Sequence, residues 1–244
     1  MLQKLLIIIV GILLLCIAYS VVNIVYKLQR SKSLVAAAEV FEKNSVTEQV
    51  DSTPSLLVLG DSTAVGVGAS TPEDSVAGLI SAHINAVYVE NHGVSGATTE
   101  DVLTKQLQHI TQDSYTIILI QVGGNDIIRF HDVEKVSAQL KEILQMLPNA
   151  ERVYITSVGN VGDATFFPFP IRPLYTKISM SYHAHFDDIS SNYGAIYINL
   201  NQPLQAQKFK DNPERYYASD GLHPSSEGYA LWFDIIEPFL SPVK

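Results

Sequence analysis

The sequence predicts an α/β fold in which a parallel sheet is covered by helices on both faces. Five short runs rich in β-branched residues alternate with amphipathic stretches from residue 55 onward. Strands that alternate with helices connect by right-handed crossovers, which place helices over both faces of a parallel sheet. A chain of 244 residues, of which 47% are hydrophobic and 17% charged, can bury the core that such a sheet and its helices need.

The expected elements follow in order along this domain. The strands are the β-branched runs at 55–60, 86–91, 115–123, 152–159 and 195–200. The helices are the stretches in which apolar residues recur every three or four positions, near 73–85, 98–110, 132–147, 173–192 and 225–240. Ligands of open parallel sheets bind outside the carboxyl ends of the strands. Functional residues are therefore expected where the strands end.

A long apolar segment at residues 5–26 precedes this domain. Its length matches the roughly 20 residues that a helix needs to cross a bilayer, whereas a cleaved signal peptide has an apolar core of roughly 7 to 15 residues. The nearest small-x-small site, at 36–38, lies well downstream. We therefore expect an uncleaved, single membrane helix at 1–30, a polar spacer at 31–54 and one domain at 55–244.

The orientation of this anchor is not fixed by its flanking charges. Lys4 lies before the apolar segment, and Lys27, Arg30 and Lys32 follow it, so a strict positive-inside count favours a cytoplasmic C-terminal domain. The only cysteine, Cys16, lies inside the apolar segment, which excludes an intramolecular disulfide and a cysteine-based metal site.

The net charge excludes one class of partner. The chain carries a formal charge of -9 and has a pI near 5.2, and its lysines and arginines form no cluster that would support nucleic-acid binding. Nucleic-acid binding needs a basic surface to offset phosphate repulsion. We therefore expect no nucleic-acid partner.

Polar residues follow three of the predicted strands and also precede the last helix. They are Gly-Asp-Ser at 60–62, Asn-His-Gly-Val-Ser-Gly at 91–96, Gly-Gly-Asn-Asp at 123–126 and Asp-Gly-Leu-His at 220–223. A doubly wound sheet brings such loops together at one edge. A serine, a histidine and an aspartate at that edge are the residues that a serine hydrolase needs.

Each of these side chains has a chemical role in that interpretation. The hydroxyl of Ser62 is a weak nucleophile unless a base accepts its proton, and His223 is the candidate base. Asp220 can hold the imidazole in one tautomer and balance its transient charge. Suitable donors to an oxyanion are the backbone N–H groups of Ser62 and Gly93 and the side-chain amide of Asn125.

These four blocks, in this order, resemble the SGNH/GDSL hydrolase family from about residue 55 to the end of the chain. The resemblance implies a flavodoxin-like three-layer α/β/α fold and an esterase that uses no metal or organic cofactor. It implies Ser62 as nucleophile, His223 as base, Asp220 as its partner, and Gly93 and Asn125 as oxyanion donors. The sequence departs from the family at Thr63, where a leucine is expected. This change affects packing behind the nucleophile.

Other motifs explain the stretch around Ser62 less well. Residues 66–68 lack the lysine of a phosphate-binding loop and the third glycine of a dinucleotide fingerprint. Ala64 stands where the nucleophile elbow of α/β-hydrolases needs glycine. Taken alone, Ser62 would be expected merely to cap a helix. The other three blocks favour the nucleophile.

Several polar residues outside the blocks are expected to be structural. His183, His185, Asp187 and Asp188 lie in a predicted helix, where positions two apart point to different faces, so we expect a solvated face rather than a metal site. His92 is expected either to line the site or to be an exposed loop residue. Asp61 and Asp126 are expected to brace loops, whereas His83, His109 and His131 show no partner pattern.

The substrate is expected to be a small-molecule, lipid or glycan ester. The aromatic, proline-rich loop at 165–175 is either an apolar wall for an acyl chain or core packing under a rigid loop. The resemblance includes esterases, carbohydrate deacetylases, lysophospholipases and thioesterases, and similarity to exported members favours the outer face of the membrane. A catalytically silent domain that binds an acylated ligand is the alternative from another class.

Overall fold

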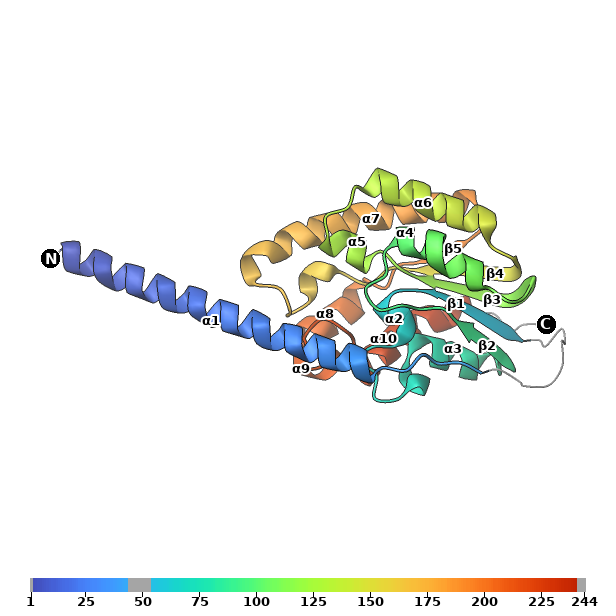
Figure 1. Ribbon diagram of the computed structural model, residues 1–244, viewed down its shortest axis with the longest axis horizontal. Coiled ribbons are helices and arrows are strands. Elements are labelled where there is room, and N and C mark those ends of the chain that lie inside the picture. The colour runs from blue at the N-terminus through green and yellow to red at the C-terminus, as the bar shows by residue number, and fades with distance from the viewer. Residues whose placement is uncertain (1, 44–53, 241–244) are drawn as a thin grey trace.

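A computed structural model of the protein describes residues 2–43 and 54–240 (Figure 1). In these residues five strands form one parallel sheet in the order β2-β1-β3-β4-β5. The strands are β1 (Ser55–Gly60), β2 (Tyr88–Asn91), β3 (Ser114–Gln121), β4 (Asn149–Thr156) and β5 (Ile196–Ile198). This is the flavodoxin-like order, in which the chain changes direction between β1 and β3. The predicted parallel sheet and flavodoxin-like fold are confirmed.

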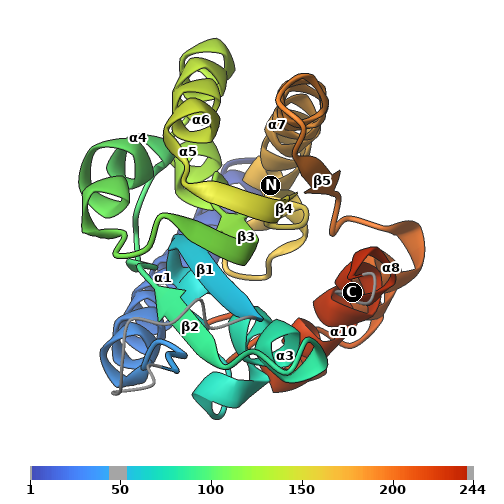
Figure 2. The ribbon, with the colours of Figure 1, turned by 90° about the vertical axis from the view of Figure 1, so that its right-hand side faces the viewer.

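Helices cover both faces of the sheet, which confirms the three layers (Figure 2). One face is covered by α3 (Val76–His83), α8 (Pro203–Asp211) and α10 (Ser226–Ile236). The opposite face is covered by α6 (Val133–Met146), α7 (Arg172–Asn192) and a short α4 (Thr99–Asp101), which continues as a π-helical and then a 3-10 turn to His109.

Each strand contributes to two cores because its successive side chains point to opposite faces. On β1, Leu56 and Val58 pack on the side of α3 and α10, whereas Leu57 and Leu59 pack on the side of α6 and α7. All four side chains have 0% exposure. A strand buried on both faces is apolar throughout, which explains why β1 shows no polar alternation in the sequence.

Four short or polar helices were not expected from the sequence. They are α2 (Ser62–Val65), α5 (Gly124–Ile128), α8 and α9 (Pro213–Tyr216). Helix α8 buries only Phe209, so its sequence carries no apolar period, although Pro203 at its first turn is a typical start signal.

The N-terminal segment forms a single helix, α1 (Leu2–Ala37), with a mean hydropathy of 2.4 over its apolar part. Among the described residues it is the one helix that is long and apolar enough to cross a membrane, and a signal sequence would share these properties. The helix extends seven residues into the predicted spacer, beyond residue 30. Lys43 pairs with Val89 at the edge of β2, and spacer residues 44–53 lie outside the described residues.

Candidate active site

Ser62 lies at the start of α2, directly after the chain turns out of β1. The turn needs glycine at position 60, because φ is +145° and a Cβ would lie 1.9 Å from the carbonyl oxygen of Gln121. Asp61, not Ser62, caps α2: its Oδ1 accepts hydrogen bonds from the Thr63 N–H (2.8 Å) and the Thr63 hydroxyl (2.9 Å). The N–H of Ser62 has no acceptor within the described residues.

Asp61 braces this turn from a buried position, as predicted. Burial raises its pKa from 3.8 to about 6, and the hydrogen bonds from Thr63 oppose the rise. The hydroxyl of Thr63 therefore has a role that the leucine expected at this position cannot fill, because it supports the capping carboxylate.

We expect Asp61 to make the stability of the protein fall between about pH 4 and pH 6. In this window the unfolded chain releases the proton that folded Asp61 retains, so stability is fully present below the unfolded pKa and is lost as pH rises. A rise in pKa from 3.8 to about 6 corresponds to roughly 3 kcal/mol. Asp61→Asn should remove this loss in urea unfolding of the full chain in detergent. Exposed Asp187→Asn serves as the control and should retain it; an unchanged pH profile in Asp61→Asn would contradict the assignment.

The structure brings Ser62, His223 and Asp220 together in one hydrogen-bonded chain. The Ser62 Oγ lies 2.9 Å from Nε2 of His223, and Nδ1 of the same ring lies 2.6 Å from Oδ2 of Asp220. If the Nδ1–H donates to the carboxylate, Nε2 is left to accept the serine proton. This is the arrangement that activates a serine hydroxyl.

Asp220 is held rigidly in its loop and has 0% exposure. Its Oδ1 accepts backbone hydrogen bonds from Leu222 (2.9 Å) and His223 (3.1 Å). Burial alone would raise the pKa of Asp220, but the hydrogen bonds and the charge of His223 outweigh it, so the pKa lies below its ordinary value of 3.8. The carboxylate is therefore ionised at neutral pH and can balance an imidazolium.

The side chain of Asn125 reaches the same place from the start of α5. Its Nδ2 donates a hydrogen bond to the Ala97 carbonyl (3.0 Å), which fixes the amide beside the loop that follows β2. Asn125 and Ser62 line the same cavity. Ser62 and Asn125, which carry two of the three predicted oxyanion donors, therefore line one cavity.

Gly93 does not fit its predicted role. Its N–H donates to Oδ1 of Asn91 (2.9 Å), and its α-carbon packs against Ala64 and Val65 behind the nucleophile. Gly96, three residues later, lines the cavity instead, and its N–H has no acceptor within the described residues. Both glycines lie in the same motif after β2, so the spacing in the sequence does not show which of them lines the cavity.

Asp126 ties the loop after β2 to helix α5, which confirms its predicted role as a brace. Its Oδ2 accepts hydrogen bonds from the N–H and hydroxyl of Thr99, both at 3.0 Å. Its Oδ1 lies 2.9 Å from Nδ1 of His131, a partner that the sequence did not indicate. The brace holds the loop that carries Gly96 against the helix that carries Asn125.

A cavity of about 290 Å³ opens beside Ser62. Its polar part contains Ser62, Asn125 and His223, and its apolar part includes Val158, Leu200, Phe209 and Trp232. Ser31 and Val35 of α1 also line this cavity. The N-terminal helix therefore forms part of the wall of the candidate active site.

The loop at 165–175 does not line this cavity. Phe167 and Tyr175 are buried in the core on the side of α7, with ring centroids 4.4 Å apart, as the core-packing hypothesis predicts. Phe169 is different, since 78% of its surface is exposed. The hypothesis that this loop walls the catalytic cavity is wrong.

The histidines of α7 and of the loop after β2 lie outside the site. His183 is buried rather than solvated, which corrects the prediction; its Nδ1 lies 2.6 Å from the Tyr197 hydroxyl, and burial lowers its pKa to about 4. Nε2 of His92 lies 2.5 Å from Oε1 of Glu90. Across residues 2–43 and 54–240, no group of histidine, cysteine and carboxylate side chains is arranged to hold a metal ion.

Comparison with known proteins identifies the family. A model of the GDSL-like lipase/acylhydrolase family matches residues 58–231, well over half of the chain. The chain belongs to this family. The match includes Ser62, Asn125, Asp220 and His223, and the family comprises ester hydrolases.

Individual relatives of this GDSL-like hydrolase are distant. A GDSL-like esterase of Mycobacterium tuberculosis is 25% identical over 189 residues, covering 74% of this chain but only 60% of that protein. A phospholipase A1 from Streptomyces albidoflavus has a TM-score of 0.56 at 18% identity, with 76% and 98% of the two chains covered. A catalytic mutant of an acetylxylan esterase from Geobacillus stearothermophilus has a TM-score of 0.57 at 18% identity, with 80% and 98% covered. The two solved structures share its fold.

Proposed function

We propose that the protein is a membrane-tethered serine esterase that hydrolyses carboxylic esters through an acyl-enzyme on Ser62. The observation that carries this proposal is the unbroken chain from Ser62 Oγ through His223 to the buried Asp220. Such a chain prepares a nucleophile, which a domain that only binds an acylated ligand does not need.

In the acylation step, Oγ of Ser62 attacks the carbonyl carbon of the ester while Nε2 of His223 takes its proton. The tetrahedral intermediate collapses, the C–O bond to the alcohol breaks, and the imidazolium gives its proton to the leaving alkoxide. Asp220 stabilises the imidazolium through the 2.6 Å hydrogen bond. The products of this step are the free alcohol and the acyl-enzyme.

Water completes the reaction by the same path. Nε2 of His223 accepts a proton from water as the oxygen of that water attacks the acyl carbon. The bond between that carbon and Oγ of Ser62 then breaks, and the proton returns to the serine. The carboxylic acid leaves, and the starting enzyme is restored.

The oxyanion in both steps would be stabilised by three donors around the cavity. These are the free N–H of Ser62, the side-chain amide of Asn125, and the N–H of Gly96 in place of the predicted Gly93. The support for Gly96 is its position on the cavity and its lack of another acceptor within the described residues.

Asn125→Ala is expected to lower kcat by about 100- to 1000-fold, because it removes one oxyanion donor. KM for a short p-nitrophenyl ester should change little, since the lost interaction forms only in the transition state. Asn201→Ala provides a control, because Asn201 lines the same cavity and should leave kcat nearly unchanged. Equal kcat values for the two variants would remove Asn125 from the mechanism.

Tethering by α1 rests on how the helix meets the catalytic domain. The side chains of Ser31 and Val35 form part of the cavity wall, and the ammonium group of Lys27 donates a hydrogen bond to the Thr165 carbonyl. A leader that is removed would take these contacts with it. We place the catalytic domain on the outer face of the membrane, where protease added to intact cells should digest it; protection would reverse this orientation.

The proposed activity is tested with the full chain in detergent micelles. A fluorophosphonate probe should label the protein, and a short-to-long panel of p-nitrophenyl esters should be turned over. Preference for acetate would favour a deacetylase, and preference for long chains would favour an acylhydrolase. Folded protein that is neither labelled nor active would contradict the proposal.

A further inference from the structure

One face of α1 rests on the catalytic domain, whereas the rest of the helix projects away from it (Figure 1). The partly buried side chains Asn23, Lys27, Ser31 and Leu34 repeat at helical spacing and form this face. Before Asn23 the described side chains are exposed all around the helix, with 68% exposure at Val22. Before Asn23 the described side chains of the apolar part are therefore not buried by the domain, and we take their natural surroundings to be lipid.

The loop at 165–172 lies beside the end of this apolar part. A second cavity, of about 230 Å³, is lined by Tyr19, Ile24 and Lys27 of α1 and by loop residues from Thr165 to Phe169. Lys27 and Arg172 both donate hydrogen bonds to the Thr165 carbonyl, which fastens the loop to the helix. The hydrogen bond from Lys27 therefore holds the loop at a fixed position along α1.

The rise per residue of an α-helix gives the depth at which each residue of α1 would lie in a membrane. The apolar segment ends at Tyr26, so the boundary of the hydrocarbon core lies near Lys27. At about 1.5 Å per residue, Tyr19 lies about 12 Å inside this boundary for a helix along the membrane normal. Ser31 and Val35, which line the catalytic cavity, lie about 6 and 12 Å outside it.

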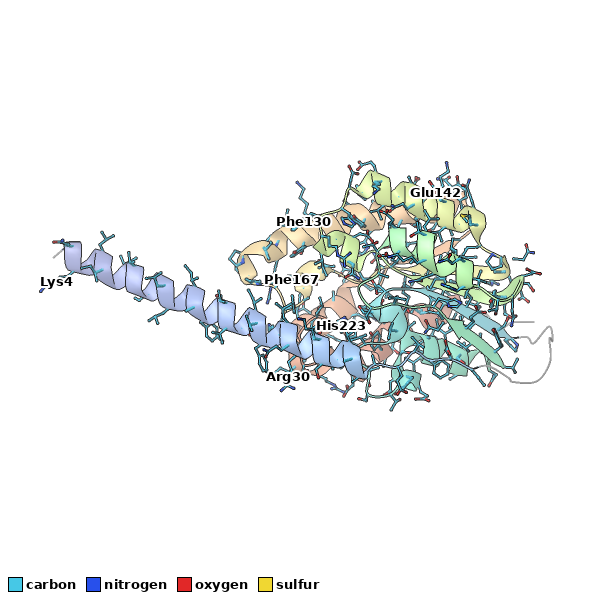
Figure 3. All side chains as sticks on the ribbon, viewed as in Figure 1. Lys4, Arg30, Phe130, Glu142, Phe167 and His223 are labelled. Carbon is cyan, nitrogen blue, oxygen red and sulfur yellow. The ribbon has the colours of Figure 1, made fainter. Side chains whose placement is uncertain are left out.

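This places the side of the cavity formed by Ser31 within the layer of lipid headgroups, which is roughly 5 to 8 Å thick on each side of the bilayer, and the side formed by Val35 just outside it. The side chains on that end of the domain suit such a position. Phe169, Leu174 and Phe130 are 78%, 47% and 50% exposed, and Phe130 lies with His223 at the end toward which α1 projects (Figure 3). Glu142 lies at the opposite end (Figure 3).

Basic side chains gather at the same level in a chain that is acidic as a whole. Lys27, Arg30 and Lys32 follow the apolar segment of α1, and Arg172 lies in the adjacent loop. The net charge of the whole chain is -9, so this cluster is local. Cations at the membrane surface attract anionic headgroups, whereas exposed phenyl rings favour the interface.

From this geometry we propose that the substrate is a glycerolipid ester that remains in the bilayer during hydrolysis. The tip of the loop at 165–172 enters the interface beside α1 and holds the cavity over the lipid surface. Ser62 then attacks a carboxylic ester that is lifted from the glycerol level toward the headgroups, while the far ends of the acyl chains stay in lipid. This inference rests on the esterase proposed above and specifies its substrate class.

The first experiment compares a lipid substrate with a soluble one. The full chain is reconstituted in vesicles of phosphatidylcholine and phosphatidylglycerol, and release of fatty acid from these lipids is measured beside hydrolysis of p-nitrophenyl butyrate. Phe169→Asp should lower fatty-acid release by about 10- to 100-fold, because a phenyl ring that enters the lipid interface is replaced by a charge. Hydrolysis of p-nitrophenyl butyrate should be unchanged. Met146→Asp, at an equally apolar exposed position on α6, should alter neither rate.

The second experiment measures depth without activity. Cys16→Ser removes the only native thiol, and Phe169→Cys or Glu142→Cys then carries an environment-sensitive fluorophore. Lipids with a spin label near the headgroup should quench the probe at position 169 and leave the probe at 142 unquenched. Equal quenching at the two positions would overturn the proposed membrane contact.

The outcomes separate this inference from the esterase proposal. If p-nitrophenyl butyrate is hydrolysed in a Ser62-dependent way but no fatty acid is released from vesicles, the esterase stands and the lipid substrate is wrong. Release of acetate from a soluble acetylated glycan, without action on vesicles, would identify the other substrate class. Loss of both activities together in Phe169→Asp would contradict the specific role of the loop.

Discussion

Replacing Ser62 with alanine is expected to lower ester hydrolysis by about 10⁴- to 10⁶-fold and to abolish fluorophosphonate labelling. The hydroxyl is the only atom group removed, and it lies 2.9 Å from the base Nε2 of His223. The cap that shapes α2 comes from Asp61 and Thr63, so the fold should survive the change. Turnover of p-nitrophenyl esters and probe labelling of the full chain measure the loss, and circular dichroism verifies the fold.

Ser95→Ala is the matched control for this prediction. Ser95 also lines the cavity, but the hydroxyl that donates to Nε2 of His223 belongs to Ser62. Activity and labelling should therefore stay close to those of the unmodified protein. A folded Ser62→Ala protein that is still labelled, or a Ser95→Ala protein that loses labelling, would show that the nucleophile is misassigned.

The sequence was sufficient for the sheet because strand burial leaves a clear pattern. Runs such as 56–59 and 117–120 are buried on both faces, so they are apolar without interruption and soon give way to polar residues. The same strand ends indicated Ser62 and Asn125 as candidates, because ligands bind at the carboxyl ends of parallel strands. The periodicity of α6 and α10 likewise follows from one buried stripe on each helix.

The sequence was insufficient where the outcome depends on a single backbone hydrogen bond or on a distant contact. Gly93 and Gly96 follow the same strand, and only the hydrogen bond from Gly93 to Asn91 shows which N–H is already engaged. The burial of His183 depends on Tyr197, fourteen residues away on β5. The contribution of α1 to the cavity wall is a contact between segments far apart in the chain, which no local period encodes.

Asp220→Asn should lower ester hydrolysis nearly as much as Ser62→Ala. It tests whether Asp220 acts by orienting His223 or by its negative charge. Oδ1 of Asp220 accepts two backbone hydrogen bonds, which the oxygen of asparagine can still accept. The amide NH₂ would then face Nδ1 of His223 and favour the tautomer with the proton on Nε2. That nitrogen could no longer accept the proton of Ser62, so kcat should fall by about 10⁴-fold with little change in folding.

Asp163→Asn isolates this effect from a general loss of negative charge. Asp163 lines the same cavity but pairs with Lys210 at 3.3 Å, away from the histidine. Its substitution should change kcat by less than about tenfold, because its ion pair with the half-exposed Lys210 does not involve His223. If both substitutions lowered kcat equally, the cavity would need negative charge rather than a defined tautomer. A large loss of kcat in Asp220→Asn alone would show that the reaction depends on the orientation and tautomer of His223.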